Sequence, residues 1–209
     1  MDQQTGSGKT YTMEGYGNDI GVSPRAISEL LKQVEQLQQD WDYKLSMSML
    51  EIYNESILDL LNSNNKEKLD IRQTAEGNQV VGLSEAVIKS MDQVKELMRQ
   101  GQANRAVGSH DMNEHSSRSH SILTIVCRGK NKIDGSSTYG KLHLIDLAGS
   151  ERISKTDATG DRLKEAQNIN KSLSALGDVV NALGNKKATH IPYRNSKLTF
   201  LLQVTCCME

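Results

Sequence analysis

The chain has 209 residues, a formal net charge of −1, 36% hydrophobic residues and 24% charged residues, a composition typical of one ordinary soluble globular domain. No apolar run approaches the ~20 residues that a membrane-spanning helix needs. Near-neutral charge and only eight aromatic residues, namely six Tyr, one Trp and one Phe, disfavour nucleic-acid binding. Three cysteines without metal-ligand spacing predict reduced thiols. We therefore expect a cytoplasmic protein that binds neither nucleic acid nor membrane.

The first half of the chain changes from helical to strand periodicity and back. Ser23–Pro24 is typical of a helix start, and apolar residues at helical spacing predict a helix through Gln39. From Trp41 to Met49 apolar residues alternate with polar ones, which predicts a half-buried strand. A short helix is expected over 55–62, followed by a polar loop. A further helix is expected from Ser90 to about Gly101.

The second half contains two strands and one long helix. Strands are predicted at Ser121–Arg128 and Lys141–Leu147, and helical spacing runs from Leu163 to Gly184. The mixture of strands and helices predicts an α/β fold. Beyond Val179 no acidic residue occurs before Glu209, so the C-terminal stretch is locally basic and suited to an acidic partner.

A candidate phosphate-binding loop lies at the start of the sequence, in the run Thr5-Gly6-Ser7-Gly8-Lys9-Thr10. Small residues let backbone amides turn toward phosphate oxygens, the lysine supplies a cation, and the threonine hydroxyl can bind Mg²⁺. The full pattern, G-x-x-x-x-G-K-[ST], begins with glycine, whereas this chain has Gln3 there. The run alone is therefore an incomplete motif.

Two further polar segments could complete a nucleotide site. Asp146-Leu-Ala-Gly-Ser-Glu151 follows a hydrophobic strand, where a carboxylate can hold a metal through water and Gly149 lets an amide approach a phosphate. Asn113-Glu-His-Ser-Ser-Arg-Ser-His120 places hydroxyls and a guanidinium before another strand. Hydroxyls suit Mg²⁺ and phosphate, and Arg118 suits a carboxylate partner.

These segments, in this order, resemble the kinesin motor domain. The 113–120 and 146–151 runs are similar to switch I and switch II of that family, Asn168–Gly177 to the long helix after switch II, and His190–Thr199 to the microtubule-facing loop and helix. Arg162–Asn170 resembles the branch with C-terminal, minus-end-directed motors. The resemblance implies a P-loop NTPase-type motor fold, with a mixed central sheet flanked by helices, whose cofactors are ATP and Mg²⁺ and whose partner is the microtubule. It therefore places the protein in the cytoplasm, on the microtubule cytoskeleton.

The resemblance also assigns roles to individual residues. Contacts with ATP are assigned to Gln3, Gln4, Thr5, Gly6, Ser7, Gly8, Lys9, Thr10, Ser117 and Asp146. Mg²⁺ is assigned to Thr10, Ser117 and, through water, Asp146. Catalytic roles in hydrolysis are assigned to Ser116, Arg118, Gly149 and Glu151, with an ion pair between Arg118 and Glu151. Contacts with tubulin are assigned to Lys155, Arg194 and Lys197, with Lys186 and Lys187 as weaker candidates.

The chain departs from the family pattern at both ends. Residues 1–209 correspond to a partial motor domain, from the phosphate loop to the microtubule-binding helix, without the family's N-terminal strands or its final strand and helix. The Asp146 strand is therefore expected to be an unprotected edge. The first hypothesis is an ATP-hydrolysing microtubule motor domain, incomplete in this chain. The alternative is a non-motile microtubule-binding module with an inactive nucleotide site. A phosphate-loop kinase or GTPase is a remote third reading, since no guanine-specific N-K-x-D loop occurs.

Overall fold

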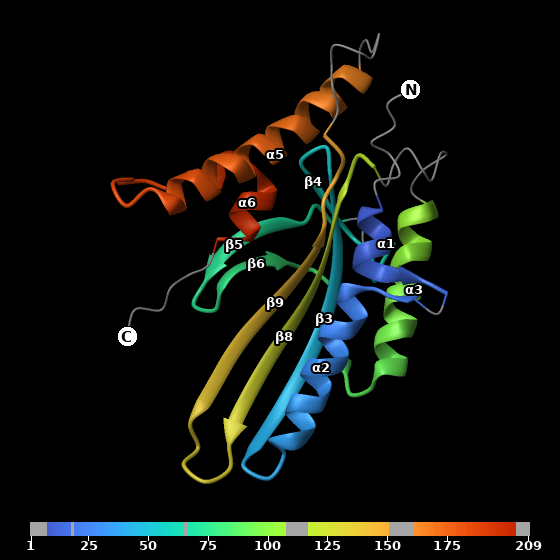
Figure 1. Ribbon diagram of the computed structural model, residues 1–209, viewed down its shortest axis with the longest axis vertical. Helices are drawn as coiled ribbons and strands as arrows, with labels where there is room; N and C mark the ends of the chain where they lie inside the picture. The colour runs from blue at the N-terminus through green and yellow to red at the C-terminus, as the bar shows by residue number, and fades with distance from the viewer. Residues whose placement is uncertain (1–7, 18, 65–66, 108–116, 151–160, 204–209) are drawn as a thin grey trace.

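The protein is built around one antiparallel sheet, seen in a computed structural model that describes residues 8–17, 19–64, 67–107, 117–150 and 161–203. The strands are ordered β4 (Ser56–Asp59), β3 (Trp41–Tyr53), β8 (His120–Asn131) and β9 (Ser137–Asp146), and β7 (Ala86–Ile88) also pairs with β3. In Figure 1 the helices α2 (Val22–Gln36) and α3 (Met91–Val107) cover one face, with α1 (Lys9–Glu14) beside them. The opposite face carries α5 (Asp161–Gly184), η2 (Tyr193–Asn195), α6 (Lys197–Leu201) and the hairpin of β5 (Asp70–Thr74) and β6 (Gly77–Val81). A short hairpin of β1 (Gly15–Tyr16) and β2 (Asp19–Ile20) joins α1 to α2. The α/β class with a flanked central sheet is confirmed.

Strand β3 separates two hydrophobic cores because its side chains alternate between the faces of the sheet. Met47 and Met49 pack into the core under α2 and α3, whereas Leu50 and Ile52 pack into the core under α6. The predicted half-buried alternation holds only for the first four residues of the strand, and Leu45–Ile52 is buried on both sides. Helices on one face and α6 on the other remove solvent from this stretch.

The helix predicted over 55–62 is wrong. Strand β4 occupies this region and pairs with β3 in a tight hairpin, Ile52 opposite Ile57 and Tyr53 opposite Ser56. The two turn residues, Asn54 and Glu55, have φ of 49° and 57°, the left-handed conformation that two-residue hairpins require. Asparagine adopts this conformation readily and glutamate does not, so residues 54 and 55 carry no recognisable hairpin signal.

The helices start and stop differently from their sequence signals. Helix α2 is capped by the backbone of Gly21, without a side-chain hydrogen bond, rather than by Ser23. Helix α3 continues six residues past Gly101, where the sequence predicted its end. A Cβ at Gly101 would lie 2.7 Å from the Cε of Met49, so this glycine allows α3 to approach β3 closely. The strands β8 and β9 and the helix α5 lie where they were predicted.

Strand β9 forms the edge of the sheet within the described part of the chain. It pairs with β8 from Lys130–Ser137 to Ser121–Asp146 and, among the described residues, with no strand on its other side. None of the described helices is both long and apolar enough to cross a bilayer.

Candidate nucleotide site

The candidate phosphate site begins where α1 starts. Gly8 precedes the helix with φ of 75°, a left-handed conformation that favours glycine. The next two residues, Lys9 and Thr10, form the first turn of α1, and both are exposed. The predicted contacts from Gln3 to Ser7 lie outside the described residues.

A hydrogen bond between two side-chain oxygen atoms joins the end of β9 to the start of α1. The Thr10 hydroxyl donates to Asp146 Oδ2 at 2.6 Å, although 136 residues separate the two in the chain. Asp146 is 7% exposed. A hydroxyl and a carboxylate are the oxygen ligands that Mg²⁺ prefers, with waters and phosphates completing its octahedron. Two of the three side chains predicted to bind Mg²⁺, Thr10 and Asp146, therefore lie together, and their chemistry fits that ion.

The turn after β9 lies against the segment before β8. The Gly149 amide donates to the Ser117 carbonyl at 2.7 Å. A Cβ built on Gly149 would lie 3.4 Å from that carbonyl oxygen and 4.0 Å from Lys9 Nζ. The structure thus brings Lys9, Thr10, Ser117, Asp146 and Gly149 to one place.

Three other predicted residues cannot be placed. Ser116, Glu151 and Lys155 lie outside the described residues, so the ion pair between Arg118 and Glu151 is not described. Arg118 itself is partly buried, one residue after Ser117.

A buried arginine that the sequence analysis missed links these elements. Arg105, in the last turn of α3, pairs through Nε with Glu51 Oε1 at 3.0 Å, and its Nη1 lies 3.8 Å from Asp146 Oδ2. Its Nη2 donates to the Ser119 hydroxyl at 3.0 Å. The side chain of Glu51 is only 2% exposed. A single charge inside the apolar run of β3 was the available signal, because buried charges occur where they are paired.

A second carboxyl group near this arginine is also shielded from water. Burial raises the pKa of Glu14, at the end of α1, while a hydrogen bond from the Gln102 amide and the charge of Arg105 oppose that rise. Asp146 is close enough to contribute to it. Glu14 therefore shares its electrostatic surroundings with Arg105 and Asp146.

His120, at the start of β8, is 3% exposed and lies behind the site. Its Nδ1 accepts from the Ala148 amide at 3.1 Å, and its Nε2 is 2.7 Å from the Ser172 hydroxyl on α5. Burial, assisted by the charge of Arg105, lowers its pKa to about 4. The ring is therefore neutral at physiological pH.

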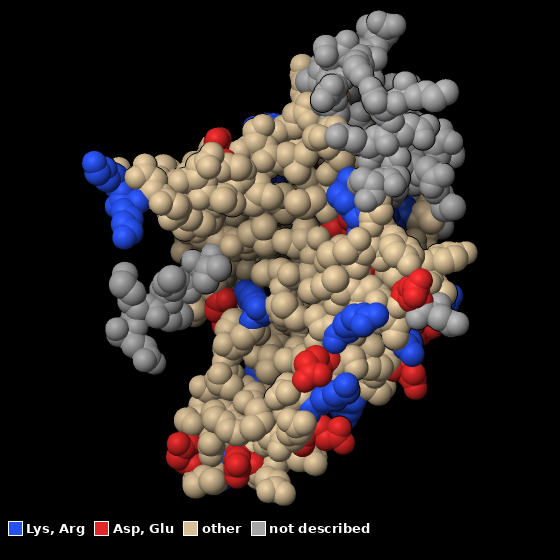
Figure 2. Space-filling view, in the orientation of Figure 1, with Lys and Arg blue, Asp and Glu red and all other residues tan. Residues whose placement is uncertain are grey.

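The predicted tubulin contacts lie around α6. Arg194 of η2 is exposed, with its guanidinium 5.7 Å from the centroid of the Phe200 ring. Lys197 Nζ is 2.7 Å from Asp70 Oδ1, so this lysine is already paired. Lys186 and Lys187 are exposed beyond α5, at the projecting tip where Figure 2 shows basic side chains.

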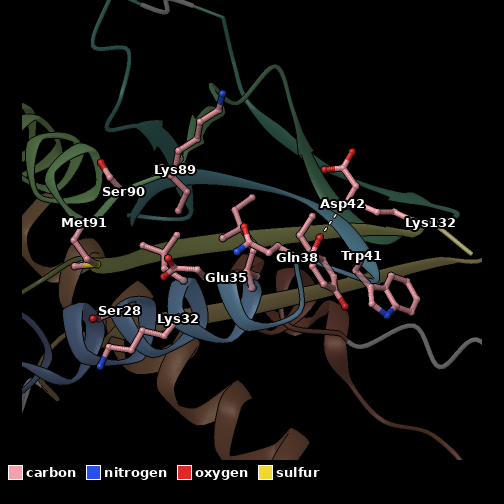
Figure 3. Close-up of a pocket in the computed structure, with 15 residues that line it drawn as sticks. Ser28, Lys32, Glu35, Gln38, Trp41, Asp42, Lys89, Ser90, Met91 and Lys132 are labelled. Carbon is pink, nitrogen blue, oxygen red and sulfur yellow. Dashed lines mark hydrogen bonds between the residues drawn. The ribbon is translucent and has the colours of Figure 1, made fainter.

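A separate groove lies between α2 and the sheet (Figure 3). Its volume is about 640 Å³, and Trp41 and Tyr43 stack along it with centroids 5.6 Å apart. Lysines and acidic side chains alternate around it, including Lys32, Glu35 and Asp42. None of its lining residues belongs to the phosphate site.

A family model for the kinesin motor domain matches residues 3–206. The chain belongs to the kinesin motor domain family. Among curated kinesins it is 54% identical over 202 residues to kinesin-like protein KIN-14E of Oryza sativa subsp. japonica, and 51% identical over 206 residues to KIN-14Q of Arabidopsis thaliana. Each match covers 96% of this chain, but only 19% and 17% of the relative.

Solved kinesin structures confirm the fold. The C-terminal motor and motor homology domain of Kar3Vik1 matches with a TM-score of 0.85 and 47% identity, over 96% of this chain and 52% of that one. The Kar3 motor domain of Saccharomyces cerevisiae matches with a TM-score of 0.82 and 45% identity, over 96% and 61%. These relatives confirm the resemblance to C-terminal-motor kinesins. The chain spans about a fifth of the curated relatives and just over half of the solved motors.

Proposed function

We propose that this chain binds ATP with Mg²⁺, hydrolyses it, and couples the state of the nucleotide to binding of microtubules. The observation that carries the proposal is the convergence of Lys9 and Thr10 with Asp146 and Gly149, although Thr10 and Asp146 are 136 positions apart in the chain. Family membership supplies the reaction, and the roles proposed for the individual residues follow from the resemblance of their motifs to those of the family.

In this proposal the phosphates lie over the start of α1. The loop from Gln4 to Thr10 would wrap them, and Lys9 would pair with the β- and γ-phosphates. Thr10 and Ser117 offer hydroxyls to Mg²⁺, while Asp146 holds it through water. Held by these residues, Mg²⁺ would supply positive charge against the negative charge that develops on the phosphates during transfer.

Hydrolysis requires a rearrangement of the turn after β9. The Gly149 amide must leave the Ser117 carbonyl before it can donate to a γ-phosphate oxygen. Ser116 and Ser117 would sense the γ-phosphate from the side of the site opposite Gly149. Arg118 then pairs with Glu151, closing the site around the attacking water, so that catalysis depends on positioning and electrostatics rather than on a strong base.

Microtubule binding is assigned to Lys155, Arg194 and Lys197. This assignment places the protein on microtubules in the cytoplasm. Lys197 must exchange its bond with Asp70 for one with tubulin, or share it. That exchange makes the contribution of this lysine sensitive to salt.

A second candidate function is supported by the sequence of the phosphate loop, in which Gln3 stands at the position where the full pattern has glycine. A side chain at this position hinders the turn with which such a loop begins. With an inactive nucleotide site, the chain would be a non-motile microtubule-binding module.

Equilibrium binding of a fluorescent ATP analogue with Mg²⁺, followed by phosphate release, separates the two candidates. The proposal expects saturable binding and turnover, both lost in Lys9→Ala and unchanged in Lys95→Ala, an exposed lysine of α3. Absence of nucleotide binding by the folded wild-type chain would reject the motor proposal and favour the alternative.

A further inference from the structure

The hydrogen bonds of His120 have only one consistent direction. The Ala148 amide can only donate, so Nδ1 must be the unprotonated nitrogen. Nε2 therefore carries the hydrogen and donates to Ser172 Oγ, and the Ser172 hydroxyl donates in turn to the Ile169 carbonyl at 2.8 Å. His120, Ala148 and Ser172 are 3%, 4% and 2% exposed. The result is a continuous buried connection.

This connection joins the phosphate site to α5. Ala148 immediately precedes Gly149, whose amide donates to the Ser117 carbonyl. Its other end lies on α5, which packs against η2 and α6, where the candidate tubulin contacts are. Figure 1 shows α5 and α6 together on the face opposite α2 and α3.

We infer that His120 is a positioning residue that couples the Ala148–Gly149 turn to α5 through Ser172. When the Gly149 amide turns toward a phosphate, the adjacent Ala148 amide moves with it. The imidazole is enclosed, so it follows that amide only by displacing Ser172 or by losing one of its two bonds. The turn and α5 consequently prefer matched positions.

The role of this connection as a link between nucleotide binding and microtubule binding rests on the proposed function. The mechanical coupling between the Ala148–Gly149 turn and α5 does not rest on it. It is tested first without any ligand, by amide hydrogen exchange of Ala148 and Gly149 in wild type, Ser172→Ala and the control Ser174→Ala, an exposed serine of the same helix.

The inference expects Ser172→Ala to speed exchange at the two amides about tenfold, the size of one lost buried hydrogen bond, with β3 unchanged. Ser174→Ala should match wild type. His120→Asn keeps an acceptor near Ala148 but cannot reach Ser172, so Ser172→Ala should have no further effect in that background. Equal exchange in Ser172→Ala and Ser174→Ala would overturn the inference.

A measurement on the wild-type chain covers the case in which the variants fail to fold. ¹⁵N chemical shifts of the imidazole should report a neutral ring protonated at Nε2, and protonation at Nδ1 would overturn the inference.

A second arm uses microtubules with a non-hydrolysable ATP analogue or with ADP. Ser172→Ala should reduce the ratio of the two affinities at least threefold while its nucleotide affinity stays within about twofold of wild type. An unchanged ratio in Ser172→Ala would overturn the coupling role. If wild type shows no such ratio, the proposed function fails, and the exchange experiment still decides the coupling.

Discussion

Replacing Arg105 by methionine would leave the Glu51 carboxylate buried without its cation. The two side chains are 11% and 2% exposed, and the atoms of the pair are 3.0 Å apart. Removing one partner of such a buried pair costs about 3–5 kcal/mol, because the remaining charge is shielded from water and has lost this partner. Small domains are stable by about 5–15 kcal/mol, so this variant should lose a large part of its stability.

The double variant Arg105→Met with Glu51→Gln should recover much of that loss. A neutral amide costs far less to bury than a carboxylate, so the two effects should fall short of additivity by about 2 kcal/mol or more. The matched control is Arg99→Met, on the same helix, because the Arg99–Glu96 pair is 71% and 63% exposed. That control should show no resolvable loss.

Urea unfolding followed by circular dichroism measures these free energies of unfolding. Additive effects of Arg105→Met and Glu51→Gln, or equal effects of Arg105→Met and Arg99→Met, would refute the claim that this buried pair organises the site.

Three further predictions concern single groups. The folded-state pKa of His120, about 4, lies below its ordinary value of 6.5, so the unfolded chain binds the proton at a higher pH than the folded chain does. The free energy of unfolding should therefore fall by about 2 kcal/mol between pH 7 and pH 5, relative to that of His120→Asn. Parallel pH profiles of wild type and His120→Asn in urea unfolding would contradict this. Thr10→Ala should weaken Mg²⁺-dependent nucleotide binding about tenfold or more while binding without Mg²⁺ changes little, measured by titration with and without a chelator; an equal loss in both would remove Thr10 from the metal site. Asp70→Asn releases Lys197 from its acidic partner and should strengthen microtubule co-sedimentation at low salt, whereas unchanged or weaker binding would mean that Lys197 does not face tubulin.

The sequence predicted the elements whose local signals agree with their tertiary surroundings. Strands β3, β8 and β9 and helix α5 have long, regular periodicity, and the structure keeps each of them. The convergence of Thr10 with Asp146 was predicted from family motifs, because sequence spacing alone cannot join residues 136 positions apart. The structure supplied the bond between them.

The features that were missed depend on contacts between distant segments. The hairpin that leads into strand β4 requires a positive φ at Glu55, and a glutamate in the sequence does not predict that conformation. Gly101 looked like the end of a helix, yet it is a contact point for Met49. Arg105 belongs to no motif used in the prediction, and only the fold places it between Glu51 and Asp146.

Microtubule co-sedimentation of the purified chain, with a non-hydrolysable ATP analogue and with ADP, tests the central claim most directly. We predict tight binding with the analogue and weak binding with ADP, a difference that Lys9→Ala should abolish. Binding that is the same with both nucleotides would contradict nucleotide coupling and leave a microtubule-binding module. Absence of microtubule binding by a folded monomer would contradict both the motor proposal and the alternative of a microtubule-binding module.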